Sequence, residues 1–167
     1  MFETERLIIR EMCPEDLDGI YAVYEGNDLR YMEGLYDDKN QEYEYIKDYQ
    51  RYIYNFYDFG IWLFEHKESG EIIGRGVVEY MVRDDGSEAV ELGYIVKKSH
   101  QGQGYAYEAL SAILSYVEET FEVKEVSAFI HPDNAPSIGL VRKLGFEKSG
   151  GDINTDNENI RFVRAFQ

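Results

Sequence analysis

Gln101-Gly102-Gln103-Gly104-Tyr105-Ala106 is the most informative stretch of this sequence. It follows a strand-like run, Val90 to Val96, and opens a helix-like run, Tyr107 to Thr120. A glycine-bearing turn at a helix start leaves backbone N–H groups without helical partners, beside the positive end of the helix dipole. Glycine also lets a ligand's oxygens approach the backbone closely. The stretch therefore predicts a site for a phosphate or pyrophosphate.

Two glycines between a strand and a helix are also compatible with a plain connection, so further residues are needed. The spacing matches neither G-x-x-x-x-G-K-[ST] nor G-x-G-x-x-G after a strand. A second constellation follows about thirty residues later. It reads Asn134-Ala135-Pro136-Ser137, and then Arg142-Lys143-Leu144-Gly145-Phe146.

Together these segments resemble the GNAT N-acetyltransferases. The stretch 101–106 resembles that family's acetyl-CoA pyrophosphate loop, [Q/R]-x-x-G-x-[G/A], and Asn134 to Phe146 resembles its N-x-x-S…K-L-G-F signature. Glu91-Leu92-Gly93-Tyr94 is similar to the E-x-G-Y strand of the subgroup related to ribosomal-protein-alanine N-acetyltransferases, the RimJ/RimL type. Thr4 to Arg10 is similar to the first strand of that subgroup. The four segments occur in the family's order and cover nearly the whole chain.

Length and composition indicate one domain, residues 1–167. A single cysteine, Cys13, excludes an intramolecular disulfide and fits a reducing compartment. We expect a cytoplasmic protein, because the chain has neither an apolar run of about eighteen residues nor a secretory signal.

The charge balance bears on the partners. The chain has 17 Lys and Arg against 33 Asp and Glu, a net charge of −16. Such a field repels nucleic acid and anionic membranes and favours a cationic amine, as a small molecule or a basic peptide. The acidity could equally serve solubility alone.

Hydrophobic periodicity predicts a mixed α/β domain. Helices are expected after Pro14, over Gln41 to Tyr57 and Tyr107 to Thr120, and over Pro136 to Leu144; Gly150 to Asn159 is expected to be a loop. The expected strands are Leu7 to Arg10, Ile61 to Glu65, Ile72 to Val82, Ala89 to Val96, Glu125 to Ile130, Phe146 to Ser149 and Ile160 to Phe166. The resemblance implies the GNAT fold, a mixed sheet of about seven strands with a splayed parallel pair, flanked by four helices.

The resemblance also implies how acetyl-CoA is held. The strands that contain Glu91 to Val96 and Val126 to Ile130 would run parallel and then splay, and the gap would accept the pantetheine arm. Tyr94, Ile95 and Val96 would lie along that arm, and Asn134 would bond to it. The pyrophosphate would bind the loop Gln101, Gly102, Gln103, Gly104, Tyr105 and Ala106.

The implied reaction is direct attack of an amine on the thioester. The amine must first lose a proton, and Glu91 is the candidate base, because it is acidic in an otherwise apolar strand. An outward or purely structural Glu91 is the alternative. Many relatives carry a tyrosine acid where this chain has Val141, so Ser137 is the candidate acid, with helix capping or cofactor bonding as its other role.

The resemblance implies that the first two helices and the loop between them, Tyr21 to Tyr57, determine the substrate, and in this chain that region interleaves acids with tyrosines. Tyr31, Glu33 and Tyr36 suit an ammonium group through charge and cation–π contact. Tyr45, Tyr49 and Tyr52 recur at helical spacing, which favours packing. A small amine, a polyamine and a protein N-terminus all stay open as acceptors, and so do a homodimer, a non-catalytic acyl-CoA-binding module and an acidic interaction domain. No cluster has metal-ligand spacing, so no metal is expected.

Overall fold

The computed structural model describes residues 1–31, 34–55, 59–82, 88–153 and 159–166. In this part of the chain one eight-stranded sheet has the order β1-β2-β3-β4-β5-β6-β8-β7. The strands are β1 (Phe2–Glu3), β2 (Leu7–Glu11), β3 (Gly60–His66), β4 (Ile72–Val82), β5 (Glu88–Val96), β6 (Glu125–Ile130), β7 (Glu147–Ile153) and β8 (Ile160–Ala165). The α-helices are α1 (Leu17–Tyr24), α2 (Lys39–Tyr49), α3 (Tyr105–Thr120) and α4 (Ala135–Lys143).

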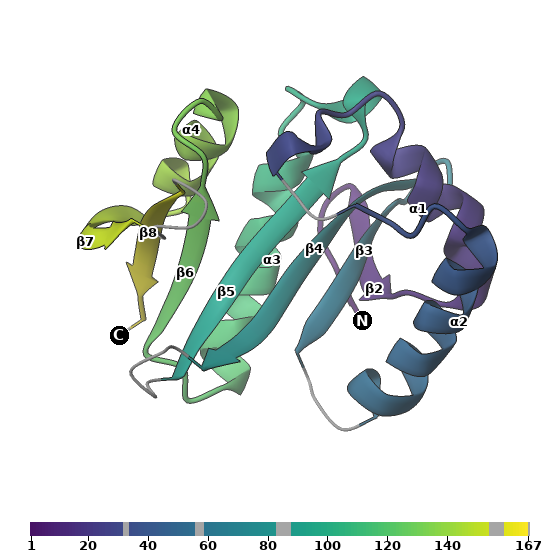
Figure 1. Ribbon diagram of the computed structural model, residues 1–167, viewed down its shortest axis with the longest axis horizontal. Coiled ribbons are helices and arrows are strands. Elements are labelled where there is room, and N and C mark those ends of the chain that lie inside the picture. The colour runs from purple at the N-terminus through teal and green to yellow at the C-terminus, as the bar shows by residue number, and fades with distance from the viewer. Residues whose placement is uncertain (32–33, 56–58, 83–87, 154–158, 167) are drawn as a thin grey trace.

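Two apolar clusters hold the helices on opposite faces of the sheet (Figure 1). The larger cluster joins α3 and α4 to one face, through Leu110, Ile113 and Val141 among others. The second joins α1 and α2 to the other face, through Ile20 and Ile46. Residues of β5 alternate between the clusters, with Leu92 on the α3 face and Ile95 on the α1–α2 face. The molecule is thus a three-layer sandwich, and the predicted mixed α/β fold is confirmed.

The predicted helix over Gln41 to Tyr57 differs from the structure in one instructive way. After Tyr49 the chain forms a π-helix, Gln50–Tyr54, and residues 56–58 lie outside the described part. The wider turn shifts the inward-facing position by one residue. Tyr54 therefore packs against Tyr49, with ring centroids 4.9 Å apart, and its hydroxyl donates to the Ile61 carbonyl. Tyr52, predicted on the packed face, is 52% exposed instead.

The expected loop after Ser149 is also shorter than predicted. Strand β7 continues through the two glycines to Ile153, which pairs with Ile160 of β8. The register shifts between Lys148 and Ile153, so the glycine pair falls at an irregularity within the strand and does not end it. Residues 154–158 of the expected loop lie outside the described part.

The packing at Gly74 generates a stability prediction. An added Cβ at Gly74 would lie 2.6 Å from the Phe64 ring and 2.7 Å from the Ile95 carbonyl oxygen. We expect Gly74→Ala to destabilise the fold by about 2 kcal/mol, which lowers Tm by roughly 4–8 °C for a chain of this size. Gly139→Ala is the control, because an added Cβ there meets no atom within 4 Å. Thermal unfolding with equal Tm values for the two variants would contradict the close packing of β4 on β3 and β5.

Candidate active site

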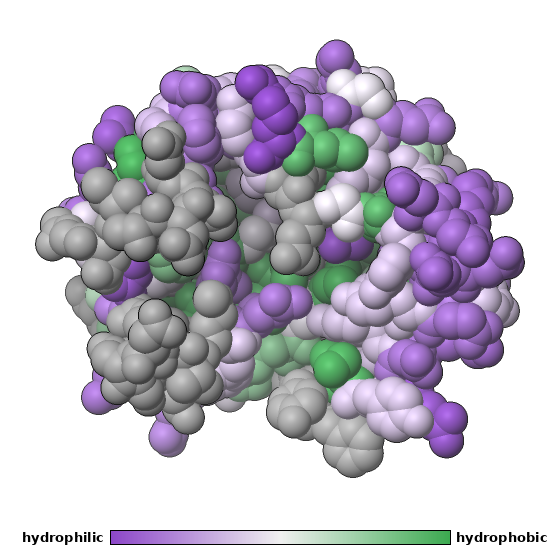
Figure 2. All heavy atoms as spheres, viewed as in Figure 1, coloured by the Kyte–Doolittle hydropathy of each residue, from purple (hydrophilic) through white to green (hydrophobic). Residues whose placement is uncertain are grey.

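The site begins where strands β5 and β6 stop pairing. The parallel pair is in register at Val90 with Val126 and at Glu91 with Ser127. Beyond these pairs β5 continues to Val96 and β6 to Ile130, and the two strands diverge (Figure 1). Figure 2 shows this face of the molecule hollowed near its centre, with apolar surface on the floor. The predicted splayed parallel pair is present.

Backbone alternation decides which groups of β5 face the gap. The Val96 carbonyl accepts hydrogen bonds from the side chains of Gln101 (2.9 Å) and Asn27 (3.2 Å), so it points away from β4. The Ile95 carbonyl points toward Gly74 of β4. Because successive backbone groups of a strand point to opposite sides, those of Tyr94 share the direction of Val96. Of the three residues predicted along the pantetheine arm, Tyr94 and Val96 therefore turn backbone groups to the gap.

The glycine loop lies at the same end of β5. Gly102 and Gly104 have φ of +73° and +86°, a left-handed conformation that favours glycine. Gly104 is the N-cap of α3, and the helix's first hydrogen bond runs from the Glu108 N–H to the Gly104 carbonyl (3.0 Å). The N–H groups before Glu108 are thus those that a helix start leaves for a ligand. Their number and the helix dipole fit the pyrophosphate of a coenzyme A.

The two glutamines of the loop hold its shape. The Gln101 amide bonds to Asn27 Oδ1 (2.6 Å) as well as to the Val96 carbonyl, which ties the loop to β5 and to the end of α1. The Gln103 amide donates to the Ser99 carbonyl (2.9 Å) within the same turn. Both side chains are therefore engaged with the protein, and the ligand-binding capacity of the loop lies in its backbone.

A further anchor of the loop was not predicted from the sequence. The Arg6 guanidinium donates to Glu108 Oε2 (2.7 Å) and to the Gln103 carbonyl (3.0 Å), and it lies 4.1 Å from the Tyr105 ring centroid. Thr4 donates to the other oxygen of Glu108 (2.6 Å). The segment Thr4 to Arg10 resembles the first strand of the family subgroup, but that resemblance does not predict which residues Arg6 contacts.

This anchor sets the charge of Glu108. Burial alone would raise its pKa, but the hydrogen bonds from Thr4 and Arg6 outweigh burial, and the pKa of Glu108 is lowered. The carboxylate is therefore ionised at neutral pH. Its stabilising contribution is complete above the ordinary glutamate range and is lost as the pH falls through the lowered pKa.

Two hydroxyls meet across the gap. Tyr94 of β5 and Ser137 of α4 are hydrogen-bonded, with 3.0 Å between their oxygens. Burial raises the pKa of Tyr94, and the bond to Ser137 only partly offsets it, so the phenol carries its proton at neutral pH. Asn134 caps α4 by accepting from the Ser137 N–H (3.4 Å). Val141 is 1% exposed and belongs to the core, so it contributes no group to the gap.

The opposite face of β5 carries Glu91 and Gly93. By strand alternation these residues share the face of Ile95, which packs with α1 and α2. Across β4, Glu91 is in register with Glu79, and Gly93 with Val77. Among the described residues, no atom lies within 4 Å of a Cβ built at Gly93, so the described surface is open there. Glu91 thus borders an opening at the level where the strands begin to diverge.

The predicted substrate residues are separated in the structure. Tyr31 lies against His131 at the end of β6, with ring centroids 5.1 Å apart. Tyr36 lines a cavity of about 290 Å³ on the α1–α2 face, which is bounded by Gly34, Leu35, Tyr36, Glu42, Tyr45 and Arg75. Glu33 lies outside the described residues. Of the two predicted residues that the structure describes, Tyr36 lines this cavity and Tyr31 does not.

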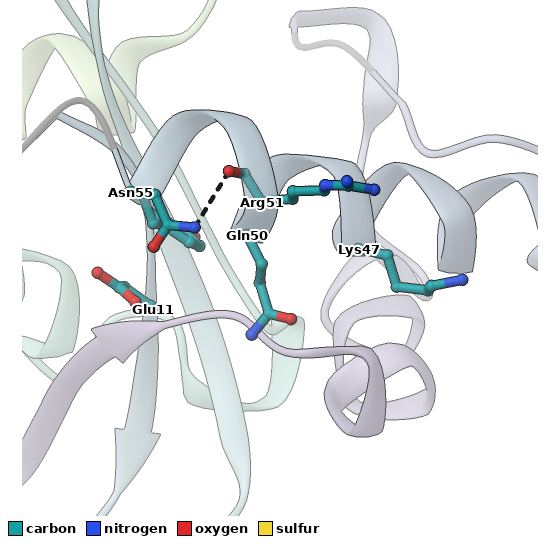
Figure 3. A pocket seen from close by; sticks show the side chains of 6 residues that line it. Glu11, Lys47, Gln50, Arg51 and Asn55 are labelled. Carbon is teal, nitrogen blue, oxygen red and sulfur yellow. Dashed lines mark hydrogen bonds between the residues drawn. The ribbon is translucent and has the colours of Figure 1, made fainter.

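A larger hollow lies elsewhere, beside the π-helix (Figure 3). It measures about 540 Å³ and is bounded by Glu11, Lys47, Gln50, Arg51, Tyr54 and Asn55. These described lining residues come from β2, α2 and the π-helix that follows α2, together with its C-cap, Asn55. None of them comes from the diverging strands or the glycine loop. It is therefore separate from the candidate site.

A glycine loop at a helix start, beside a parallel strand pair that separates, is the arrangement that the sequence resemblance implies for an acyl-CoA-dependent transferase. A family model described as an acetyltransferase (GNAT) domain matches residues 6–147. The chain belongs to this family and is an acetyl-CoA-dependent N-acetyltransferase, which confirms the resemblance and the cofactor predicted from the sequence.

Individual relatives agree. YoaA of Bacillus subtilis, described as an uncharacterized N-acetyltransferase, is 27% identical over 152 residues, 90% of this chain and 84% of its own. The ribosomal protein uS5-alanine N-acetyltransferase of Escherichia coli is 38% identical over 88 residues, 53% of this chain and 44% of its own. The crystal structure of an acetyltransferase from Agrobacterium tumefaciens superposes with a TM-score of 0.79 at 21% identity, covering 98% and 92% of the two chains.

No helix in the part of the chain that the structure describes is long and apolar enough to cross a membrane. Within the same residues, no group of three or more His, Cys, Asp or Glu side chains is placed to hold a metal ion.

The Arg6 anchor yields a prediction on cofactor affinity. We expect Arg6→Met to weaken acetyl-CoA binding about tenfold in calorimetry, because the loop loses hydrogen bonds to a charged group. Arg10→Met is the matched control: Arg10 lies in β2, the strand that begins directly after Arg6, and is also ion-paired, but to Asp16 (2.7 Å) and Glu65 (2.6 Å). If both variants bind acetyl-CoA equally well, Arg6 does not position the loop.

Proposed function

We propose that this enzyme transfers the acetyl group directly to a primary amine that enters from the α1–α2 face. The observation that carries the proposal is the place of the opening at Gly93. On one side of β5 the diverging strands lead to the glycine loop, and on the other side the open surface at Gly93 borders Glu91. Two reactants approaching from opposite faces would meet at this strand without crossing each other's path.

When bound, acetyl-CoA supplies the acetyl group as an activated thioester. The loop N–H groups of residues 102–106 would hold its pyrophosphate. The gap-facing backbone of Tyr94 would lie along its arm, and its N–H is a donor for the thioester oxygen as negative charge develops there. Asn134 and Ser137, at the start of α4, would border the same arm.

Glu91 is the proposed base. Only the neutral amine is nucleophilic, so an ammonium acceptor must give up a proton before attack. Glu91 lies on the face from which the acceptor would enter, three residues before Tyr94. A carboxylate in that position accepts the proton, directly or through one water. Its neighbour in register, Glu79, lies on β4, farther from the gap.

The pair Tyr94 and Ser137 is the proposed proton donor to the leaving sulfur. Its hydroxyls are hydrogen-bonded at the gap, and the raised pKa of Tyr94 keeps the phenol protonated. The sequence suggested Ser137 alone for this role, because Val141 stands where many relatives carry tyrosine. In this chain the phenol can come from the strand instead of the helix.

The acceptor class rests on charge and on relatives. The net charge of −16 favours a cationic amine over an anionic partner. The Escherichia coli relative acts, by its name, on an alanine of ribosomal protein uS5, and such an acceptor is an amine. A small amine, a polyamine and a protein N-terminus are all compatible with these two points.

The base assignment gives a kinetic prediction. We expect Glu91→Gln to lower kcat by about 100-fold or more, to leave acetyl-CoA affinity unchanged and to remove the acidic limb of the pH–rate profile. Glu79→Gln is the matched control, because Glu79 is the cross-strand neighbour on the same face. A Glu91→Gln enzyme with the wild-type pH profile would remove Glu91 as the base.

The acid assignment is tested by two single variants and their combination. We expect Tyr94→Phe and Ser137→Ala each to lower kcat, and the double variant to lose little more than the worse single one, because the hydroxyls act as one unit. Rates of CoA release with a fixed amine provide the measurement. Additive losses in the double variant would show that the two hydroxyls act separately.

A further inference from the structure

The cavity on the α1–α2 face contains an unusual pair of charged groups. Glu42 of α2 is 2% exposed, and its carboxylate accepts from the Tyr36 N–H (3.1 Å). Arg75 of β4 borders the same cavity, together with the ring of Tyr45. A small cavity on this acidic molecule therefore holds a buried carboxylate and a cation together.

One nitrogen of the Arg75 guanidinium lacks a hydrogen-bond acceptor among the described residues. Its Nη1 is buried and has no hydrogen-bond partner among the described residues. In that part of the chain no carboxylate lies within 4.0 Å of it, whereas Arg6, Arg10, Arg161 and Arg164 each pair with an acid. Its contact is with the Tyr24 ring, 5.4 Å from the guanidinium carbon. A buried cationic donor without an acceptor is destabilising, and a ligand that supplies the acceptor would remove that cost.

The cavity is adjacent to the opening at Gly93. Arg75 is in register with Ile95 of β5, and Val77 is in register with Gly93. On β4, Arg75 is two residues from Val77, and Val77 is the residue paired with Gly93. Arg75 therefore lies next to the opening that Glu91 borders. An acceptor whose amine reached Gly93 would place the atoms a few bonds away near Arg75.

We propose that the acceptor is a small zwitterion, with a carboxylate close to its primary amine, and that Arg75 binds the carboxylate. This inference rests on the proposed function and narrows it, because it disfavours polyamines, which carry no anion. The guanidinium fork matches a carboxylate in shape, and a primary amine a few bonds from that carboxylate would reach the opening that Glu91 borders. A cavity of about 290 Å³ suits a molecule of amino-acid size.

The test compares carboxylates with matched neutral molecules. The probes are the standard L-amino acids, their carboxamides and their decarboxylated amines, each added to protein saturated with CoA for thermal-shift measurement and to protein with acetyl-CoA for CoA release. We expect at least one amino acid to raise Tm and to be acetylated with a KM about tenfold or more below that of its carboxamide.

Variants of Arg75 distinguish a specific loss of carboxylate binding from a loss of folding or of acetyl-CoA binding. We expect Arg75→Gln to remove the preference for the carboxylate and Arg75→Lys to retain part of it, while acetyl-CoA affinity stays unchanged in both. Arg51→Gln is the matched control: Arg51 is an exposed arginine beside the other hollow, and its loss should change none of these values. The Tm of each variant without ligand reports any loss of folding.

The outcomes distinguish this inference from the proposed function. Amines without a carboxylate that are acetylated equally well by wild type and Arg75→Gln would overturn the inference and leave the proposed function standing. Amino acids that bind through Arg75 but release no CoA would support the carboxylate site and contradict the proposed function. If no amino acid raises Tm above its carboxamide, Arg75 is satisfied by water and the inference is wrong.

Discussion

The whole arrangement depends on the point at which two parallel strands stop pairing. Strands β5 and β6 share register at only two residue pairs, the second of which is Glu91 with Ser127. Beyond it, backbone groups on the facing edges of both strands lack a neighbouring strand, and such groups need partners. An extended amide-bearing arm can supply them in the way an added strand would. In the proposed mechanism the separation creates the site for acetyl-CoA, and the last paired residues set how deep in the sheet the thioester would lie.

The other features are arranged around this separation on the two faces of the sheet. On the α3 face the glycine loop is tied to β5 by Gln101 and to the N-terminal segment by Arg6. The contacts of Gln101 and Arg6 order the glycine turn before the ligand arrives. Ligand binding therefore loses little conformational entropy of the loop. On the α1–α2 face an added Cβ at Gly93 would meet no atom of the described residues within 4 Å, and the proposed acceptor would reach the same strand through this opening.

Much of the fold could be predicted from the sequence, because local patterns determine it. Strands β4 and β6 were predicted with their observed ends, and the glycine loop was placed at the start of α3, since alternation and helix-start signals are local. The contacts of Arg6 with Gln103 and Glu108 join residues about a hundred positions apart, and no local pattern encodes them. The face of Glu91, the π-helix after Tyr49 and the unpaired Arg75 likewise depend on tertiary packing.

Amide hydrogen exchange, followed residue by residue by NMR with and without acetyl-CoA, tests whether the separated edge of β5 holds the cofactor. We expect acetyl-CoA to protect the amides of Gly102 to Ala106 and the gap-facing amide of Tyr94, whereas the Ile95 amide, on the β4 side, changes little. Protection confined to residues around the hollow beside the π-helix, or equal protection of Tyr94 and Ile95, would contradict the claim that the separated edge of β5 holds the cofactor.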